Sequence, residues 1–210
     1  MTVSDKPQRK RFSPEIRRGM LLDHAAELVV SEGIAGLTLE RIAREAGVSK
    51  SLIYNYFDGV SDLLKELYER ELKGLRHQQY LAAQKAKSYE EMVRGITHEY
   101  LKYIERHGQV IERLQAEPSV SNGRDPTYYD RQSSVDYMAK LVMEHFDMPL
   151  DFAKAITEVS YGLPASAGEY LLRGDIDRDE LEDLTVSMIL GAVLNARNNY
   201  LARRKSFNPG

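Results

Sequence analysis

Apolar residues recur along most of this chain at spacings of three and four, which is the periodicity of an amphipathic helix. The first such segment begins at Ser13-Pro14, since serine caps helices and proline is favoured at the first helical position. One face of this predicted helix is formed by Leu21, Ala25, Leu28 and Val29. Gly33 and Gly36 follow and end the helix.

Two short helices and six further ones follow from the same pattern. Thr38 and Ser49 are capping residues for the short pair, with Gly47 as the break between them and Phe57 as the last residue of the second. The other predicted helices cover about residues 61–87, 88–106, 108–116, 127–146, 149–172 and 179–204, with Pro164 expected to kink the eighth. No alternating strand pattern is present, so the sequence predicts an all-α fold of about nine helices.

Residues 38–57, TLERIAREAGVSKSLIYNYF, are the most informative segment. Ala43 and Gly47 are small residues four positions apart, which allows two short helices to cross closely over a tight turn. The apolar positions that hold this pair together are Ile42, Ala46, Val48, Ile53 and Phe57. The side chains left to face outward are Lys50, Ser51, Leu52, Tyr54, Asn55 and Tyr56. A cation, hydroxyls, an amide and phenols suit DNA phosphates and major-groove base edges.

This region resembles the N-terminal domain of TetR-family transcriptional regulators. The resemblance covers residues 13–68 and is carried by Leu21-Leu22-Asp23, Ala25, Leu28, Gly33, Thr38, Ile42-Ala43, Ala46-Gly47-Val48-Ser49, Ile53-Tyr54, Tyr56-Phe57 and Leu63-Leu64. It implies an N-terminal arm and three-helix helix-turn-helix DNA-binding domain over residues 1–61. It further implies a helical ligand-binding and dimerisation domain over residues 62–210.

The resemblance also implies which residues contact DNA. Thr38 would meet a phosphate through its hydroxyl, and Tyr56 would meet another. The full set expected at DNA is Arg17, Arg18, Thr38, Ser49, Lys50, Ser51, Leu52, Tyr54, Asn55 and Tyr56. Leu52 stands where a small polar residue is usual, so it either touches a thymine methyl group or packs inward. Val60 stands where a phosphate-contacting lysine is frequent, so that contact is expected to be missing.

The net charge of the whole chain does not favour nucleic-acid binding. The chain has 29 Lys and Arg against 32 Asp and Glu, a formal charge of −3. The charge is uneven, however, because residues 6–18 carry +5, residues 1–57 carry +2, and the remainder carries −5. The basic arm at residues 6–11 either follows the DNA backbone or is a solvated tail, and charge alone does not decide between the two.

Several classes of protein are disfavoured by what the sequence lacks. It contains no cysteine, which removes disulfides and thiolate metal sites, and no apolar run approaches the ~18 residues of a membrane span. Lys102 rather than histidine follows His98-Glu99, so the zinc-protease motif is absent, and none of the 14 glycines forms a GxG sequence. We therefore expect a soluble cytoplasmic protein that is not an enzyme, with no catalytic residue, metal, cofactor or membrane partner.

The C-terminal part of the chain is longer than a three-helix DNA-binding domain requires. Small residues recur in the last two predicted helices, at Gly162, Ala165, Ser166, Ala167 and Gly168 and around Met188, Ile189, Gly191, Ala192, Leu194 and Asn195. They permit close helix packing and indicate a two-fold interface between two copies of the chain. Tyr103, Tyr137 and Tyr161 fall in mid-helix and are expected to line a cavity for an apolar or amphipathic small molecule.

Together these observations favour a ligand-responsive DNA-binding transcriptional regulator. The leading hypothesis is a homodimeric repressor that binds a near-palindromic double-stranded DNA operator and is released by a small-molecule effector. One alternative is a DNA-binding regulator controlled by a protein partner. The other is a helical interaction module that has lost DNA binding.

Overall fold

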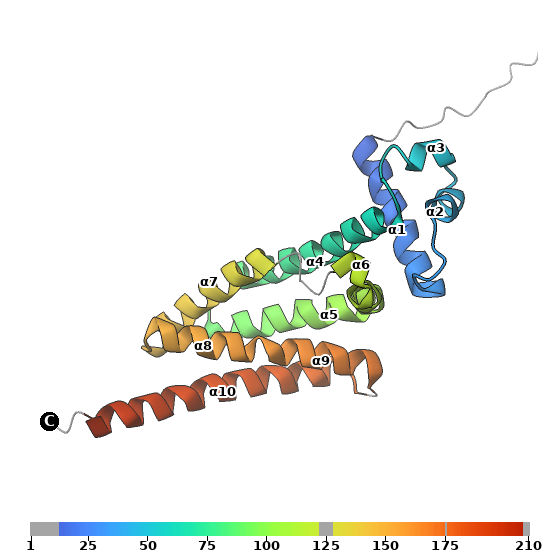
Figure 1. The fold of residues 1–210 in the computed structure, drawn as a ribbon. Coiled ribbons are helices and arrows are strands. Elements are labelled where there is room, and N and C mark those ends of the chain that lie inside the picture. The colour runs from blue at the N-terminus through green and yellow to red at the C-terminus, as the bar shows by residue number, and fades with distance from the viewer. Residues whose placement is uncertain (1–12, 122–127, 175, 208–210) are drawn as a thin grey trace, which may run out of the picture. The chain divides into compact units, whose positions relative to one another are not determined.

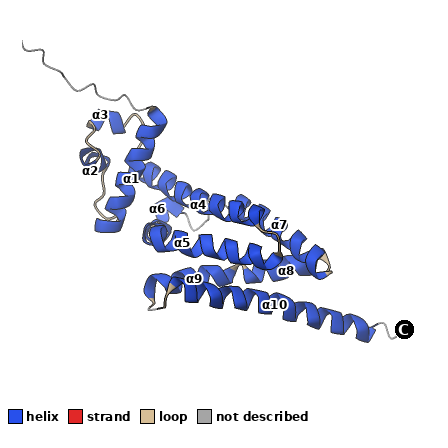
Figure 2. Ribbon diagram, turned by 180° about the vertical axis from the view of Figure 1, so that it is seen from behind, coloured by secondary structure: helices blue, strands red, loops and turns tan. Residues whose placement is uncertain are grey.

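The computed structural model describes residues 13–121, 128–174 and 176–207. Every regular element within these ranges is a helix, and the helices run in chain order from α1 to α10 (Figure 1). Figure 2 shows the same helices from the opposite side, joined by short loops. The predicted all-α fold is therefore confirmed. The chain divides between Leu67 and Tyr68 into two compact units.

The N-terminal unit contains α1 (Pro14–Glu32), α2 (Leu39–Glu45), α3 (Lys50–Ile53) and the start of α4 (Val60–Lys85). α2 packs against both α1 and α3. The buried side chains of this unit are Leu21, Leu22, Ala25, Leu28, Val29, Leu39, Ile42, Ala43, Ile53, Phe57, Leu63, Leu64 and Leu67. The apolar face predicted for α1 is thus its buried face.

The ends of α1 follow from the sequence signals. Ser13 Oγ accepts a hydrogen bond from the backbone N–H of Ile16 at 3.3 Å, and Pro14 is the first helical residue. Gly33 ends the helix with a φ of 84°, in the left-handed region that favours glycine. The chain leaves α1 at this point and turns towards α2.

The C-terminal unit is a bundle built from the rest of α4 with α5 (Tyr89–Ala116), α6 (Pro118–Ser121), α7 (Tyr128–Phe146), α8 (Leu150–Ser160), α9 (Gly162–Arg173) and α10 (Arg178–Phe207). α5, α9 and α10 pack against one another, and α7 packs on α8 (Figure 1). The contacts between α5, α9 and α10 centre on Val93, Leu101, Ala167, Leu181, Val186 and Ile189.

One predicted helix break is wrong. The sequence suggested separate helices over residues 88–106 and 108–116, whereas α5 continues through Gly108. This glycine is explained by packing, because a Cβ atom there would lie 2.8 Å from Leu172 Cδ1. Gly168 on α9 is similar, since a Cβ atom there would lie 2.8 Å from Tyr100 Cε1. Both glycines allow α5 and α9 to approach closely.

Two other boundaries also differ from expectation. The helix predicted over residues 149–172 is divided at Tyr161 into α8 and α9, and Pro164 lies in the first turn of α9, where its missing N–H costs least. α3 ends at Ile53, while the sequence predicted a helix to Phe57. After Ile53 the chain continues in tight turns, in which the N–H of Asn55 bonds to the carbonyl of Leu52 at 3.1 Å.

Among the residues that the structure describes, none of the helices combines the length and apolar character that a membrane span needs.

Candidate functional site

The two short helices of the N-terminal unit are positioned by their caps and the turn between them. Thr38 Oγ1 accepts the N–H of Arg41 at 3.1 Å, and Ser49 Oγ accepts the N–H of Leu52 at 3.3 Å. Gly47 has a φ of 65°, and this left-handed residue reverses the chain between α2 and α3. The result is a helix-turn-helix whose second helix begins at Lys50.

The side chains predicted to face outward lie on the exposed side of α3 and the turn after it. Lys50, Ser51, Tyr54 and Asn55 are exposed, as are the capping residues Thr38 and Ser49. Leu52 and Tyr56 are only half-buried. Ile53 and Phe57 point into the core. α3 and the turn after it therefore present a cation, hydroxyls, an amide and a phenol to solvent.

Glu40, on α2, contacts two side chains of this face. Its Oε1 is 2.8 Å from Lys50 Nζ and accepts a hydrogen bond from the Tyr54 hydroxyl at 3.0 Å. The Lys50 ammonium also lies 5.8 Å from the centroid of the Tyr54 ring. The hydrogen bond from Lys50 is the main reason that the pKa of Glu40 falls to about 2, and the pKa of Lys50 rises in turn.

Sequence reasoning missed Glu40 because it lies on a different helix from the residues it contacts. Helical spacing relates side chains of one helix and gives no contact between α2 and α3. The available signal was an acidic residue in a segment otherwise suited to DNA phosphates. Glu45 in the same segment gives the same signal, so the sequence alone does not single out Glu40.

Arg17 and Arg18 both lie on α1, and both side chains are half-buried. Arg18 Nε donates to Glu66 Oε1 at 2.6 Å, its Nη2 donates to the second carboxylate oxygen, and its guanidinium lies 4.9 Å from the centroid of the Phe57 ring. Arg18 therefore joins α1 to the start of α4. The arm residues Lys6, Arg9, Lys10 and Arg11 lie outside the described part of the chain.

Comparison with known proteins identifies this unit. Residues 21–67 match the tetR family of bacterial regulatory proteins, a segment that contains α2, the Gly47 turn and α3. The N-terminal unit thus matches the TetR family over this segment. The predicted resemblance is thus confirmed, and TetR-family proteins are transcriptional regulators rather than enzymes, as expected for this chain.

Individual TetR-family relatives match this chain over different lengths. The HTH-type transcriptional regulator BetI of Agrobacterium fabrum is 35% identical over 83 residues, which is 40% of each chain. The HTH-type transcriptional activator FasR of Mycolicibacterium smegmatis is 22% identical over 87% of this chain and 85% of its own. A TetR-family regulator from Streptomyces coelicolor shares the fold, with a TM-score of 0.68 and 20% identity over 87% of this chain and 97% of that one.

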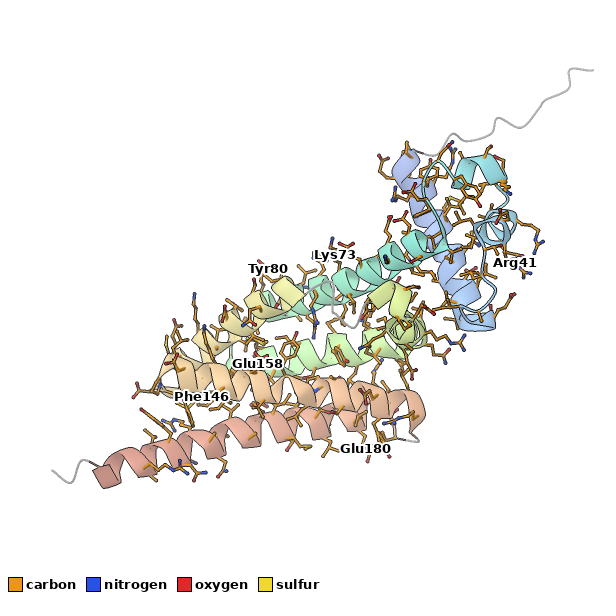
Figure 3. The ribbon with its side chains drawn as sticks, viewed as in Figure 1. Arg41, Lys73, Tyr80, Phe146, Glu158 and Glu180 are labelled. Carbon is orange, nitrogen blue, oxygen red and sulfur yellow. The ribbon has the colours of Figure 1, made fainter. Side chains whose placement is uncertain are left out.

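The C-terminal unit contains two adjoining cavities of about 450 and 390 Å3. They share the lining residues Arg76, Gln79, Ile96, Met138 and Tyr161. Arg76 Nη1 donates to the Tyr161 hydroxyl at 2.9 Å and to Gln79 Oε1 at 3.2 Å. The larger cavity is also lined by Lys73 and Tyr80, which are on α4 (Figure 3).

The three tyrosines expected at a cavity do not all lie there. Tyr137 lines the larger cavity, and Tyr161 lines both. Tyr103 is not among the residues lining either cavity, because its hydroxyl donates to Glu71 Oε2 at 2.9 Å and its ring stacks on His107 at 4.3 Å. Sequence reasoning missed Tyr89 and Tyr100, which line the smaller cavity and have their pKa raised to about 12 by burial.

The residues predicted for a dimer interface divide into two groups. Ala167, Gly168 and Ile189 are buried inside the unit, so they were wrongly assigned to an outer face. The others are exposed on α9 and α10, namely Gly162, Ala165, Ser166, Met188, Gly191, Ala192, Leu194 and Asn195. On α10 the exposed stripe also includes Leu184, four residues before Met188.

Within the described ranges, His, Asp and Glu side chains form no group of three or more with the geometry to hold a metal ion.

Proposed function

We propose that this protein is a homodimeric, ligand-responsive transcriptional repressor that binds a near-palindromic DNA operator. The observation that carries the proposal is the exposed face of α3, where Lys50, Ser51, Tyr54 and Asn55 project from a helix-turn-helix of TetR-family sequence. In such a unit the second helix enters the major groove, where these side chains reach base edges and phosphates. Thr38 and Tyr56 flank this face and supply hydroxyls to the phosphate backbone.

A second copy of the chain is the proposed partner on α9 and α10. Leu184, Met188, Gly191 and Asn195 follow one another at spacings of four, three and four, so they form one exposed stripe along α10. Ala165 and Ser166 are exposed on the neighbouring helix α9. Small and apolar residues allow two such helix pairs to pack closely around a two-fold axis. This symmetry matches a palindromic operator with two half-sites.

The two adjoining cavities of the C-terminal unit are the proposed effector site. Their mixture of tyrosines, methionines and isoleucine suits an apolar or amphipathic molecule, and Tyr137 and Tyr161 line them as candidate contacts. An effector would act by binding more tightly to a dimer whose recognition helices no longer match the operator spacing. The size of the response is limited by the difference between its affinities for the two states.

We further propose that the protein acts as a repressor. Its proposed location is the cytoplasm, because a regulator of this kind acts where its DNA is. The relative FasR is a transcriptional activator by name. A reporter gene placed behind the regulated promoter therefore decides the direction, and its expression should rise when this protein is removed.

The testing experiment is a fluorescence titration of DNA from the region upstream of the protein's own gene, repeated over a range of salt concentrations. We expect a two-fold-symmetric site, with binding that weakens as salt rises. Lys50→Ala and Tyr54→Ala should each lower the operator affinity, on the order of tenfold. Val30→Ala, on the exposed side of α1, is the control that should leave it unchanged.

The outcomes also separate the two alternatives. Absence of sequence-selective binding at low salt would contradict the proposal and favour an interaction module that has lost DNA binding. Selective binding that responds to a protein but to no small molecule would favour control by a partner. Unchanged affinity in both the Lys50 and the Tyr54 variants would refute the assignment of α3 as the recognition helix.

A further inference from the structure

A negative charge, Glu40 of α2, lies beside the reading face formed by Lys50, Ser51, Tyr54 and Asn55. Glu40 Oε1 is held between Lys50 Nζ at 2.8 Å and the Tyr54 hydroxyl at 3.0 Å. Both partners belong to the residues proposed to contact DNA, whereas Glu40 itself would repel a phosphate. An acid in the first turn of α2 is favoured by the helix dipole, but that does not account for its two contacts with Lys50 and Tyr54.

We infer that Glu40 is a specificity-determining residue that suppresses binding to DNA of the wrong sequence. The inference rests on the DNA-binding function proposed above. Glu40 neutralises Lys50 and accepts the hydrogen of the Tyr54 hydroxyl, so a phosphate meets a cation that is already paired and a hydroxyl that already donates elsewhere. A phosphate that contacts Lys50 is then brought close to the Glu40 carboxylate, and the repulsion between the two anions offsets part of the attraction.

Contacts from Lys50 to base edges are not opposed by Glu40 to the same degree as contacts to phosphates. The guanine O6 and N7 atoms are neutral acceptors, so Lys50 can reach them without drawing a second anion towards Glu40. A cytosine amino group can also donate directly to a carboxylate. Glu40 therefore penalises contacts that every DNA sequence offers more than contacts that only the operator offers. Because the phosphate term supplies essentially all non-specific binding, the penalty raises the ratio of specific to non-specific affinity.

Protonation does not relieve this penalty under physiological conditions. The pKa of Glu40 lies at about 2, chiefly because of the hydrogen bond from Lys50, so the carboxylate is charged across the neutral range. Selectivity from this source is accordingly constant between about pH 5 and pH 8. Glu40 is therefore a fixed negative charge and does not act as a pH switch.

Glu45 supplies a matched control on the same helix. Its side chain is 42% exposed, against 43% for Glu40, and it pairs with Arg41 Nε at 3.1 Å rather than with α3. Glu40→Gln and Glu45→Gln change the net charge equally, but only the first releases Lys50. Figure 3 labels Arg41 on α2, the helix that carries both acids.

The test measures binding to a duplex of shuffled sequence, so it does not depend on knowing the operator. Glu40→Gln should bind this duplex about eightfold more tightly than the wild type at 0.1 M salt. The slope of log affinity against log salt concentration should steepen by about 0.9 per protomer, as for one added phosphate contact. Glu45→Gln should behave as the wild type. In a Lys50→Met background, Glu40→Gln should have no further effect. Circular dichroism and thermal unfolding verify that each variant is folded.

The inference is overturned if Glu40→Gln binds the shuffled duplex no more tightly than the wild type. It is also overturned if Glu45→Gln gains as much, because the effect would then be one of net charge, or if the gain persists without Lys50. Failure of the proposed function has a different signature, in which neither the wild type nor Glu40→Gln distinguishes the upstream DNA from the shuffled duplex.

Discussion

Arg18 and Glu66 form a two-point ion pair within the N-terminal unit. Both the Nε and the Nη2 of Arg18 donate to the carboxylate, and the guanidinium lies over the Phe57 ring. Phe57 is buried at the end of the segment that contains the recognition helix. The pair thus connects α1 and α4 at the point where the helix-turn-helix meets its supporting core.

Arg18→Met should lower the free energy of unfolding by roughly 1 kcal/mol, because a bidentate pair of partly exposed side chains is worth little more than that. Glu66→Gln should have a similar effect, and a double-mutant cycle by urea denaturation should give a coupling energy of about 0.5–1 kcal/mol. Arg17→Met should leave stability nearly unchanged while weakening binding to any duplex. A coupling energy of zero would remove the structural role of Arg18.

Gly47 offers a test of the turn that places α3. Its φ of 65° costs a residue with a Cβ atom about 1–2 kcal/mol, and no neighbouring atom lies within 4 Å of that position, so the cost is purely conformational. Gly47→Ala should therefore lower stability by about 1 kcal/mol, and Gly47→Asn by less. Gly19→Ala, in the middle of α1 with equally open space, should instead increase stability by about 0.5–1 kcal/mol. Thermal unfolding of the three variants measures the two expected decreases in stability and the expected increase.

The helices and the reading face could be predicted because their signals are local. Ser13, Thr38 and Ser49 are caps within three residues of the N–H groups they accept, and the periodicity of α1 directly gives its buried face. Lys50 and Tyr54 were placed outward by the same periodicity. These features depend on spacing within one helix, which a sequence displays.

Contacts between helices were not predictable in the same way. Gly108 has the appearance of a helix breaker, yet it is required where Leu172 packs on α5. The hydrogen bond from Tyr103 to Glu71 removes that tyrosine from the cavities, and the two residues are on different helices. The pairing of Glu40 with α3 belongs to the same class. Such contacts depend on how helices cross, and the period of a single helix does not encode that.

The cavity tyrosines should make stability sensitive to alkaline pH. Burial raises the pKa of Tyr89 and Tyr100 to about 12, above the value of about 10 for an exposed tyrosine. A raised pKa means that the unfolded chain loses its protons first, so stability is complete below about pH 10 and falls as pH rises towards 12. Urea unfolding should show this decline, and Tyr100→Phe should reduce its slope. An unchanged slope in that variant would contradict burial as the cause.

The exposed stripe on α10 should control assembly. Met188→Glu places a charge where the proposed interface excludes water, which should weaken dimerisation on the order of 100-fold, or about 3 kcal/mol. Ile16→Glu is the control, since Ile16 on α1 is 54% exposed and Met188 is 51% exposed. Analytical ultracentrifugation should find the Met188 variant monomeric at concentrations where the wild type and the control are dimers. A dimer that resists the Met188 substitution would place the interface elsewhere.

The adjoining cavities can be tested by filling the wall they share. Ile96 lines both cavities, so Ile96→Trp would insert an indole into the space proposed for the effector. The probe 1-anilinonaphthalene-8-sulfonate should bind the wild type in a saturable manner, and the substitution should reduce that binding at least tenfold. Overpacking costs about 1–3 kcal/mol, so circular dichroism must show that the variant stays folded. Val30→Trp, on the exposed side of α1, should bind the probe as the wild type does. Undiminished binding in the folded Ile96 variant would mean that the probe occupies another surface, and the effector site would then have to be sought outside these cavities.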